Sequence, residues 1–150
     1  MHRIPRLILR LLSLLPLRAL HALGTVLGWI IYGMSPTYRR HLRAHLAQAG
    51  YGDAATRRAA IAAAGCMILE TPLLWFRPQD EVVSLVREAS GFDAALAAHA
   101  QGKAILFLTP HLGSFEITLQ YVSLRFPVTA VYRPPKMRWL EPLMREGRGR

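Results

Sequence analysis

Residues 105–117, ILFLTPHLGSFEI, decide the expected fold. They overlap KAILFLT (103–109), a continuous apolar run bounded by glycine and proline, which is typical of a strand buried on both faces. The next segment, GSFEITLQYVSLRF (113–126), has helical spacing, and PVTAVYRP (127–134) predicts a second short strand. Strand, helix and strand in this order form a βαβ unit. The sequence therefore predicts an α/β fold with a mainly parallel sheet.

Polar side chains follow both predicted strands, with His111 after the first and Arg133 after the second. Ligands of parallel sheets bind at the carboxyl ends of the strands, so we expect both side chains at one edge. On a continuous helix His111 and Glu116, five positions apart, would point in different directions. If His111 lies in the loop before the helix, Glu116 falls in the first helical turn and its carboxylate can reach the imidazole.

Such a pair is suited to general-base catalysis, because the carboxylate orients the imidazole and stabilises the imidazolium that forms. Gly113, between His111 and Glu116, would let the backbone approach a substrate closely. A structural alternative stays open at this point. In it, Glu116 is only a favourable first-turn carboxylate and His111 is an ordinary loop residue.

Composition indicates an anionic partner. The 150 residues are 52% hydrophobic and carry 19 Lys and Arg against 9 Asp and Glu. This combination favours a membrane surface or a nucleic acid. The basic residues are spread along the chain without an interleaved basic and aromatic motif, so we expect no nucleic-acid partner. Cys66 is the single cysteine, which excludes an intrachain disulfide, and its apolar context predicts a buried, inert thiol.

Residues 1–34 are apolar but interrupted by arginines. The cleanest run, 19–34, would reach about 24 Å as a helix, short of the roughly 30 Å hydrocarbon core. Three interpretations stay open: a spanning anchor with snorkelling arginines, an interfacial helix pair, and a signal peptide. The signal peptide fits worst, because arginine interrupts the apolar run and no A-x-A site closes it. We expect 1–34 to be a membrane anchor or interfacial region.

Helix-start signals organise the segment that follows. Ser35 is expected to cap a basic helix that has Pro36 at its first position, and Asp53 to cap a helix over about 54–70. The proline-containing segment ETPLLWFRP (70–78) is expected to break that second helix. Further on, GFDAALAAHAQGK predicts a helix that starts near Asp93 and stops at Gly102.

The basic helix also contains His41 and His45, spaced like a helical pair of metal ligands. No acidic residue lies between them and no third ligand is apparent, so we expect no metal site. Contact between the basic helix face and lipid head groups explains the segment better.

LTPHLGSFE (108–116) resembles the H-x-x-x-x-D/E block of the glycerolipid acyltransferase superfamily. More narrowly, the chain is similar to the late lauroyl/myristoyl acyltransferases of bacterial lipid A synthesis. AVYRPPK (130–136), followed by the basic MREGRGR (144–150), resembles the second block of that family. The resemblance implies membrane-associated N-terminal helices followed by a glycerol-3-phosphate acyltransferase-like α/β domain, here residues 35–150.

The resemblance also implies an activity: transfer of an acyl chain from acyl carrier protein to a hydroxyl of a lipid A precursor. The reaction would take place on the cytoplasmic side of the inner membrane and would need no cofactor. His111 would be the base and Glu116 its partner, while Arg133, with Tyr132 and Lys136 of the same block, would contact substrate. Phe115 stands where the family usually has tryptophan, and Met137 where it often has asparagine.

Two alternatives remain beside this activity. One is a non-catalytic membrane protein that binds lipid or acyl carrier protein, and the other is a related acyltransferase acting on lysophospholipid or an amino-lipid. The chain ends at Arg150, where the family continues through further strands and substrate-binding blocks. The sequence is then either a fragment or a degenerate member of the family. We expect a fragment, the N-terminal part of an acyltransferase domain, that is inactive by itself.

Overall fold

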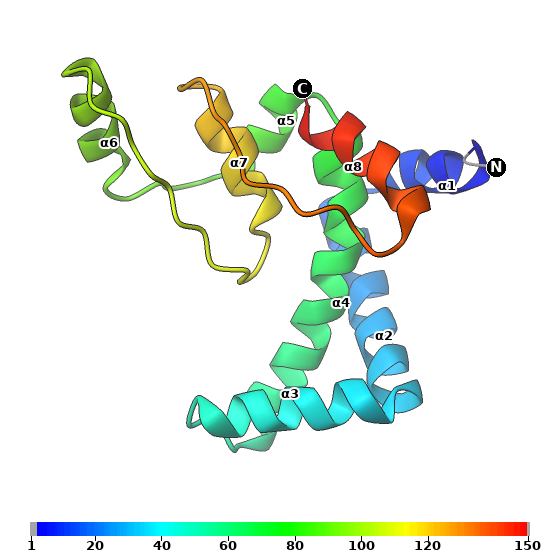
Figure 1. Ribbon diagram of the computed structural model, residues 1–150. Coiled ribbons are helices and arrows are strands. Elements are labelled where there is room, and N and C mark those ends of the chain that lie inside the picture. The colour runs from blue at the N-terminus through cyan, green and yellow to red at the C-terminus, as the bar shows by residue number, and fades with distance from the viewer. Residues whose placement is uncertain (1–2, 150) are drawn as a thin grey trace. The chain divides into compact units, whose positions relative to one another are not determined.

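The computed structural model describes residues 3–149, which divide into two compact units. The first comprises Met1–Arg77 and Pro134–Arg150, and the second comprises Pro78–Arg133. Every regular element in the described part of the chain is a helix. The first unit contains α1 (Arg3–Ser13), α2 (Leu17–Met34), α3 (Pro36–Gln48), α4 (Ala54–Phe76), the 3₁₀ helix η1 (Arg138–Leu140) and α8 (Glu141–Arg148) (Figure 1). The second unit contains α5 (Gln79–Val83), α6 (Phe92–Ala100) and α7 (Glu116–Ser123).

The expected α/β fold is wrong, because residues 3–149 form no strand and no sheet. A strand needs a neighbour to accept and donate its backbone hydrogen bonds, and neither 103–109 nor 127–133 forms such a ladder. Side-chain packing holds the first segment instead. Phe107 stacks on Phe92 with ring centroids 6.4 Å apart, whereas Leu106 is 85% exposed. The apolar run is therefore neither part of a sheet nor buried as the sequence predicts, since even Phe107 is 37% exposed.

The core of the first unit lies between α2 and α4, which run side by side (Figure 1). Glycines allow the two backbones to touch. A Cβ atom added to Gly24 would lie 2.6 Å from the Cα of Cys66, and one added to Gly28 would collide with the carbonyl of Ile61. Gly65 faces both glycines from α4. Small residues spaced i,i+4 are what permits such close helix packing.

The proline in α4 does not break the helix, contrary to the sequence prediction. α4 continues through Pro72 to Phe76, and Pro72, Leu73 and Trp75 are all buried. Proline removes one backbone donor and its ring disfavours a straight helix, at a cost of about 3 kcal/mol. Burial of the last turn offsets that cost. The helix ends at Arg77, whose guanidinium donates to the carbonyl oxygens of residues 13 and 15.

Capping residues fix the ends of α3 and α4 as the sequence predicts. The Ser35 hydroxyl accepts a hydrogen bond from the Tyr38 N–H at 3.2 Å, and Pro36 occupies the first turn of α3. The Asp53 carboxylate accepts one from the Thr56 N–H at 2.7 Å. Hydrogen bonds from the backbone N–H and the side chain of Thr56 lower the pKa of Asp53 below its usual value, because they stabilise the charged form. α3 therefore follows α2 without a loop.

The second unit packs around aromatic rings. Phe126 lies 4.9 Å from His99 and 5.7 Å from Phe92, measured between ring centroids. Val82 of α5 and Val122 of α7 are buried, and α5 contacts α7. α6 begins at Phe92 and stops before Gly102, whose φ of +74° closes the helix, so the predicted helix over this segment is confirmed.

Within residues 3–149, two helices are long and apolar enough to cross a membrane, namely α2 and α4. Length and composition alone are weak evidence, since core helices and signal sequences share them. Residues 3–34 form two helices rather than one, because α1 ends at Ser13 and Pro16 precedes α2. A membrane anchor over 1–34, and a domain boundary at residue 34, stay predictions.

Candidate functional site

The predicted base, His111, lies in the exposed segment that precedes α7. Its imidazole ring packs on Phe115, with centroids 4.2 Å apart and planes tilted by 35°. Gly113 turns the chain between these two residues with φ of +56°, a conformation that L-residues with a Cβ rarely adopt. No atom approaches a Cβ built on Gly113 within 4 Å, so the space beside this turn is open. The segment presents an accessible imidazole next to open space.

Glu116 is the first residue of α7, and its side chain is partly buried. The preceding Phe115 cannot cap the helix with a side-chain oxygen, so the turn closes through backbone bonds. The N–H of Ile117 donates to the Ser114 carbonyl at 3.1 Å. A carboxylate in the first turn interacts favourably with the helix dipole. The spacing predicts a helix from about residue 113, whereas α7 begins at Glu116, which still places this carboxylate in the first turn.

His111 and Glu116 lie on either side of one turn. Within the part of the chain that the structure describes, however, no hydrogen bond joins His111 to Glu116. The ring of His111 meets Phe115 instead. Hydrogen bonds of catalytic groups often tighten only when substrate is bound. The pairing of His111 with Glu116 stays a prediction.

The second sequence block lies in a segment without helix or strand. Tyr132 is partly buried, and Arg133 is exposed at the end of the second unit. Lys136 is exposed and belongs to the first unit. His111 and Arg133 do not meet at the edge of a sheet as predicted, because the described residues form no sheet. Arg133 and Lys136 are therefore two exposed cations suited to phosphate binding, whereas the Tyr132 hydroxyl oxygen is buried.

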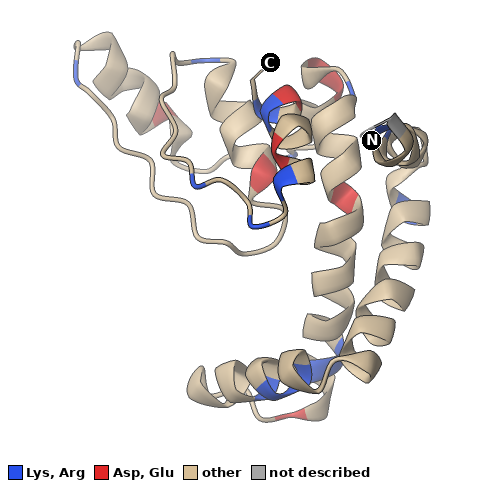
Figure 2. Cartoon of the chain, turned by 45° about the vertical axis from the view of Figure 1, so that its right-hand side comes forward, with Lys and Arg blue, Asp and Glu red and all other residues tan. Residues whose placement is uncertain are grey.

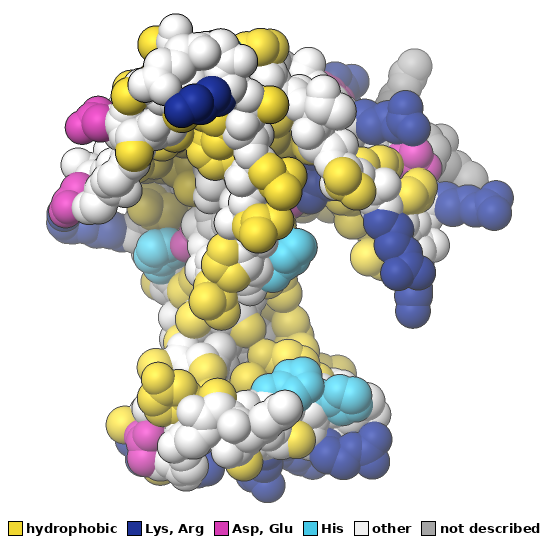
Figure 3. All heavy atoms as spheres, turned by 60° about the vertical axis from the view of Figure 1, so that its left-hand side comes forward, with side chains coloured by type: hydrophobic (Ala, Val, Ile, Leu, Met, Phe, Trp, Pro, Cys, Tyr) yellow, Lys and Arg dark blue, Asp and Glu magenta, His cyan; other side chains and the backbone are white. Residues whose placement is uncertain are grey.

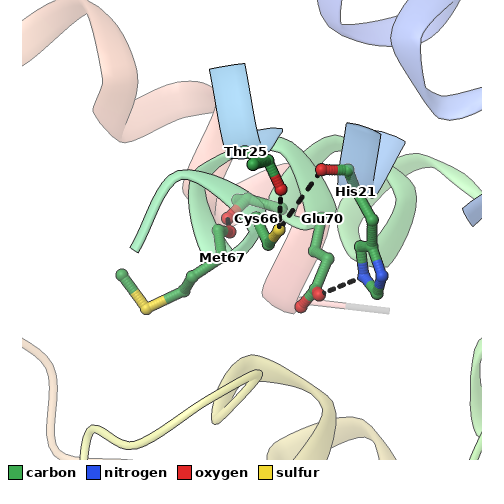
Figure 4. Close-up of polar contacts among 6 residues, drawn as sticks. His21, Thr25, Cys66, Met67 and Glu70 are labelled. Carbon is green, nitrogen blue, oxygen red and sulfur yellow. Dashed lines mark hydrogen bonds and ion pairs between the residues drawn. The ribbon is translucent and has the colours of Figure 1, made fainter. Parts of the chain in front are cut away.

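The sequence analysis missed a polar cluster between α2 and α4 (Figure 4). The His21 Nε2 lies 2.6 Å from a carboxylate oxygen of Glu70, and the Cys66 thiol donates to the His21 carbonyl at 3.4 Å. Thr25 contacts the same thiol at 3.7 Å. The spacing carried a signal: His21 and Thr25 are four apart, as are Cys66 and Glu70. The cluster ties the two helices together across their apolar contact.

The second unit also contains a hollow of about 260 Å³, lined by His99, Gly102, Lys103, Ala104, Ile105, Phe107 and Phe126. Across residues 3–149, no three His, Cys, Asp or Glu side chains gather in a way that could hold a metal ion.

Comparison with known proteins identifies the family. Residues 5–150 match the family described as "Bacterial lipid A biosynthesis acyltransferase". No curated protein and no solved structure matches the chain. The family match covers nearly all of the sequence, including both blocks and the N-terminal helices. The chain therefore belongs to the bacterial lipid A biosynthesis acyltransferase family.

Proposed function

We propose that the protein transfers an acyl chain from the thioester of acyl carrier protein to a hydroxyl of a lipid A precursor, on the cytoplasmic side of the inner membrane. Membership in the family supports acyl transfer to a lipid A precursor. The single observation that carries the finer proposal is the position of His111, exposed in the loop that leads into α7, with Glu116 at the first helical position.

In the proposed mechanism, His111 removes the proton of the acceptor hydroxyl, and the alkoxide oxygen attacks the thioester carbonyl carbon. Glu116 orients the imidazole and stabilises the imidazolium. Collapse of the tetrahedral intermediate breaks the carbon–sulfur bond, and the thiolate takes the proton from the imidazolium. Backbone N–H groups beside Gly113 are suited to stabilise the oxyanion, because this turn has open space next to it.

Arg133, Tyr132 and Lys136 are proposed to contact the anionic groups of the substrates. Arginine and lysine bind phosphate through charge-assisted hydrogen bonds, and tyrosine can donate one more. The N-terminal region, residues 1–34, is proposed to hold the enzyme at the membrane in which the acceptor lies. The exposed apolar residues of α1, among them Ile4 at 72% and Leu7 at 58%, support this assignment.

The test is acyl transfer by the protein expressed from its complete reading frame. Acyl carrier protein loaded with a labelled acyl chain and a lipid A precursor are the substrates, and mass spectrometry identifies the product. We expect His111→Ala to abolish turnover and Leu112→Ala, a change of an exposed neighbour, to leave it near wild type. Transfer to lysophospholipid alone, or binding of lipid without any transfer, would replace this proposal with one of the two alternatives.

A further inference from the structure

We propose that α3 and the first turn of α4 form a docking surface for the anionic head groups of a phospholipid membrane. Residues 35–59 contain five arginines, namely Arg39, Arg40, Arg43, Arg57 and Arg58. Asp53 is the one acidic residue in that range, and its carboxylate is occupied by the Thr56 N–H. The surface, which we call the α3 basic surface, therefore carries a large local excess of positive charge (Figure 2).

The charge on the α3 basic surface is available to a partner. Arg40 and Arg58 are exposed and Arg39 is half-buried. Within residues 3–149 the side chains of these three arginines form no ion pair and no hydrogen bond. At 100° per residue, Arg39, Arg40 and Arg43 fall on one flank of α3, whereas Tyr38, Leu42 and Leu46 turn toward the protein.

α3 is held in a fixed position at the end of the α2–α4 pair. Ser35 joins α2 to α3 directly and caps α3. The Arg43 Nε donates to the Tyr32 hydroxyl of α2 at 2.9 Å, and the guanidinium lies 5.9 Å from the centroid of the Tyr32 ring. The arginines are thus presented at a defined place on the first unit.

Apolar side chains adjoin this charge. On α2, Val26, Trp29, Ile30 and Met34 are exposed, Met34 to 80%. Trp29 packs edge-on against Tyr32 at 6.0 Å between ring centroids. Figure 3 shows basic and histidine side chains gathered at the α3 end of the molecule, with hydrophobic side chains over the helices beside them. Arginines next to tryptophan, tyrosine and an apolar helix face are the pattern of a bilayer interface.

A lipid surface accounts for both halves of this pattern, because phosphates meet the arginines while acyl chains meet the apolar side chains. An acidic protein would account for the arginines alone. The arginines lie outside residues 1–34, so their share of the binding can be measured separately from acyl transfer, whereas the apolar half of the pattern belongs to α2 and is shared with the proposed anchor. Each cation near an anionic leaflet contributes about fivefold in partitioning, and three contribute roughly 100-fold.

The experiment measures partitioning of the protein, expressed from its complete reading frame, into vesicles of phosphatidylethanolamine and phosphatidylglycerol at about 0.1 M salt. The test variant combines Arg39→Gln, Arg40→Gln and Arg58→Gln. The matched control combines Arg87→Gln, Lys103→Gln and Arg138→Gln, which removes the same charge outside α3 and α4. A third variant replaces Arg39, Arg40 and Arg58 by lysine, which keeps the charge. Phosphatidylcholine vesicles report binding that does not depend on lipid charge.

We expect the glutamine variant to lose roughly 100-fold in partitioning into anionic vesicles, and the control and lysine variants to stay near wild type. No variant should change binding to phosphatidylcholine appreciably. Unchanged partitioning of the glutamine variant would overturn the proposal. An equal loss in the control variant would also overturn it, because binding would then depend on the net charge of the protein and not on the α3 basic surface. Loss of binding to acyl carrier protein with vesicle binding intact would assign the surface to an acidic protein instead.

Discussion

Close contact between α2 and α4 can be tested by adding one methyl group at Gly24. A Cβ at this position would lie 2.6 Å from the Cα of Cys66 and 2.9 Å from the carbonyl oxygen of Gly65. Ordinary van der Waals contact begins near 3.4 Å, so the backbones would have to separate by 0.8 Å, the difference between 3.4 and 2.6 Å. Both obstructing groups are backbone, which cannot move aside as a side chain can.

Gly33→Ala is the matched control, because Gly33 lies in the same helix and a Cβ there meets nothing within 4 Å. Alanine in place of glycine stabilises a helix by roughly 0.5–1 kcal/mol, and this gain applies to both variants. Overpacking costs about 1–3 kcal/mol and applies to Gly24→Ala alone. We therefore expect the free energy of unfolding of Gly24→Ala to be lower than that of Gly33→Ala by about 1–3 kcal/mol.

The assay is urea unfolding in mild detergent, followed by circular dichroism, for wild type and both variants. Gly33→Ala should be as stable as wild type or slightly more stable. If both substitutions stabilised the protein equally, the α2–α4 backbones would not be in contact at Gly24, and the packing described for the first unit would be wrong.

Three further predictions follow from the contacts. The pKa of Asp53 is lowered in the folded state, so its charged carboxylate, which caps α4, should stabilise the protein fully above the ordinary aspartate pKa. This stabilisation should be lost as the pH falls through the lowered pKa. The free energy of unfolding of Asp53→Asn, measured against pH, should lack this loss at acidic pH. Glu70→Gln should weaken the contact with the half-exposed His21 and cost about 1 kcal/mol in urea unfolding, and no change would show that the 2.6 Å contact contributes nothing. Arg133→Ala should raise the KM for substrate roughly ten- to hundredfold at unchanged stability, and an unaltered KM would remove Arg133 from the site.

Local signals in the sequence predicted much of the helical structure. Ser35 with Pro36, Asp53, and Gly102 act through hydrogen bonds or backbone angles within a few residues, and the structure confirms each of them. Local signals of this kind do not determine whether 103–109 and 127–134 form strands. An apolar run favours burial, yet 103–109 is largely exposed, because no neighbouring strand covers it and local sequence does not specify such a neighbour.

Other features depend on how helices pair in space. α4 passes Pro72 because its last turn is buried; the apolar residues after the proline indicate burial but do not show that the helix continues. The His21–Glu70 contact joins residues 49 positions apart. For the site, the sequence indicated a loop at His111 followed by a helix, but α7 begins at Glu116 rather than near residue 113. The contact between His111 and Phe115 depends on side-chain placement and was not foreseen.

The central claim, that His111 and Glu116 act together as the base for acyl transfer, is tested most directly by the turnover of Glu116→Gln in the protein expressed from its complete reading frame. Glutamine keeps the shape of the side chain but removes the charge that stabilises imidazolium. The account predicts a loss in kcat of about 10²–10⁴-fold. If Glu116 only interacts with the dipole of α7, Glu116→Gln would instead lower the free energy of unfolding by about 0.3–1 kcal/mol. Full activity in a slightly less stable Glu116→Gln would contradict the account.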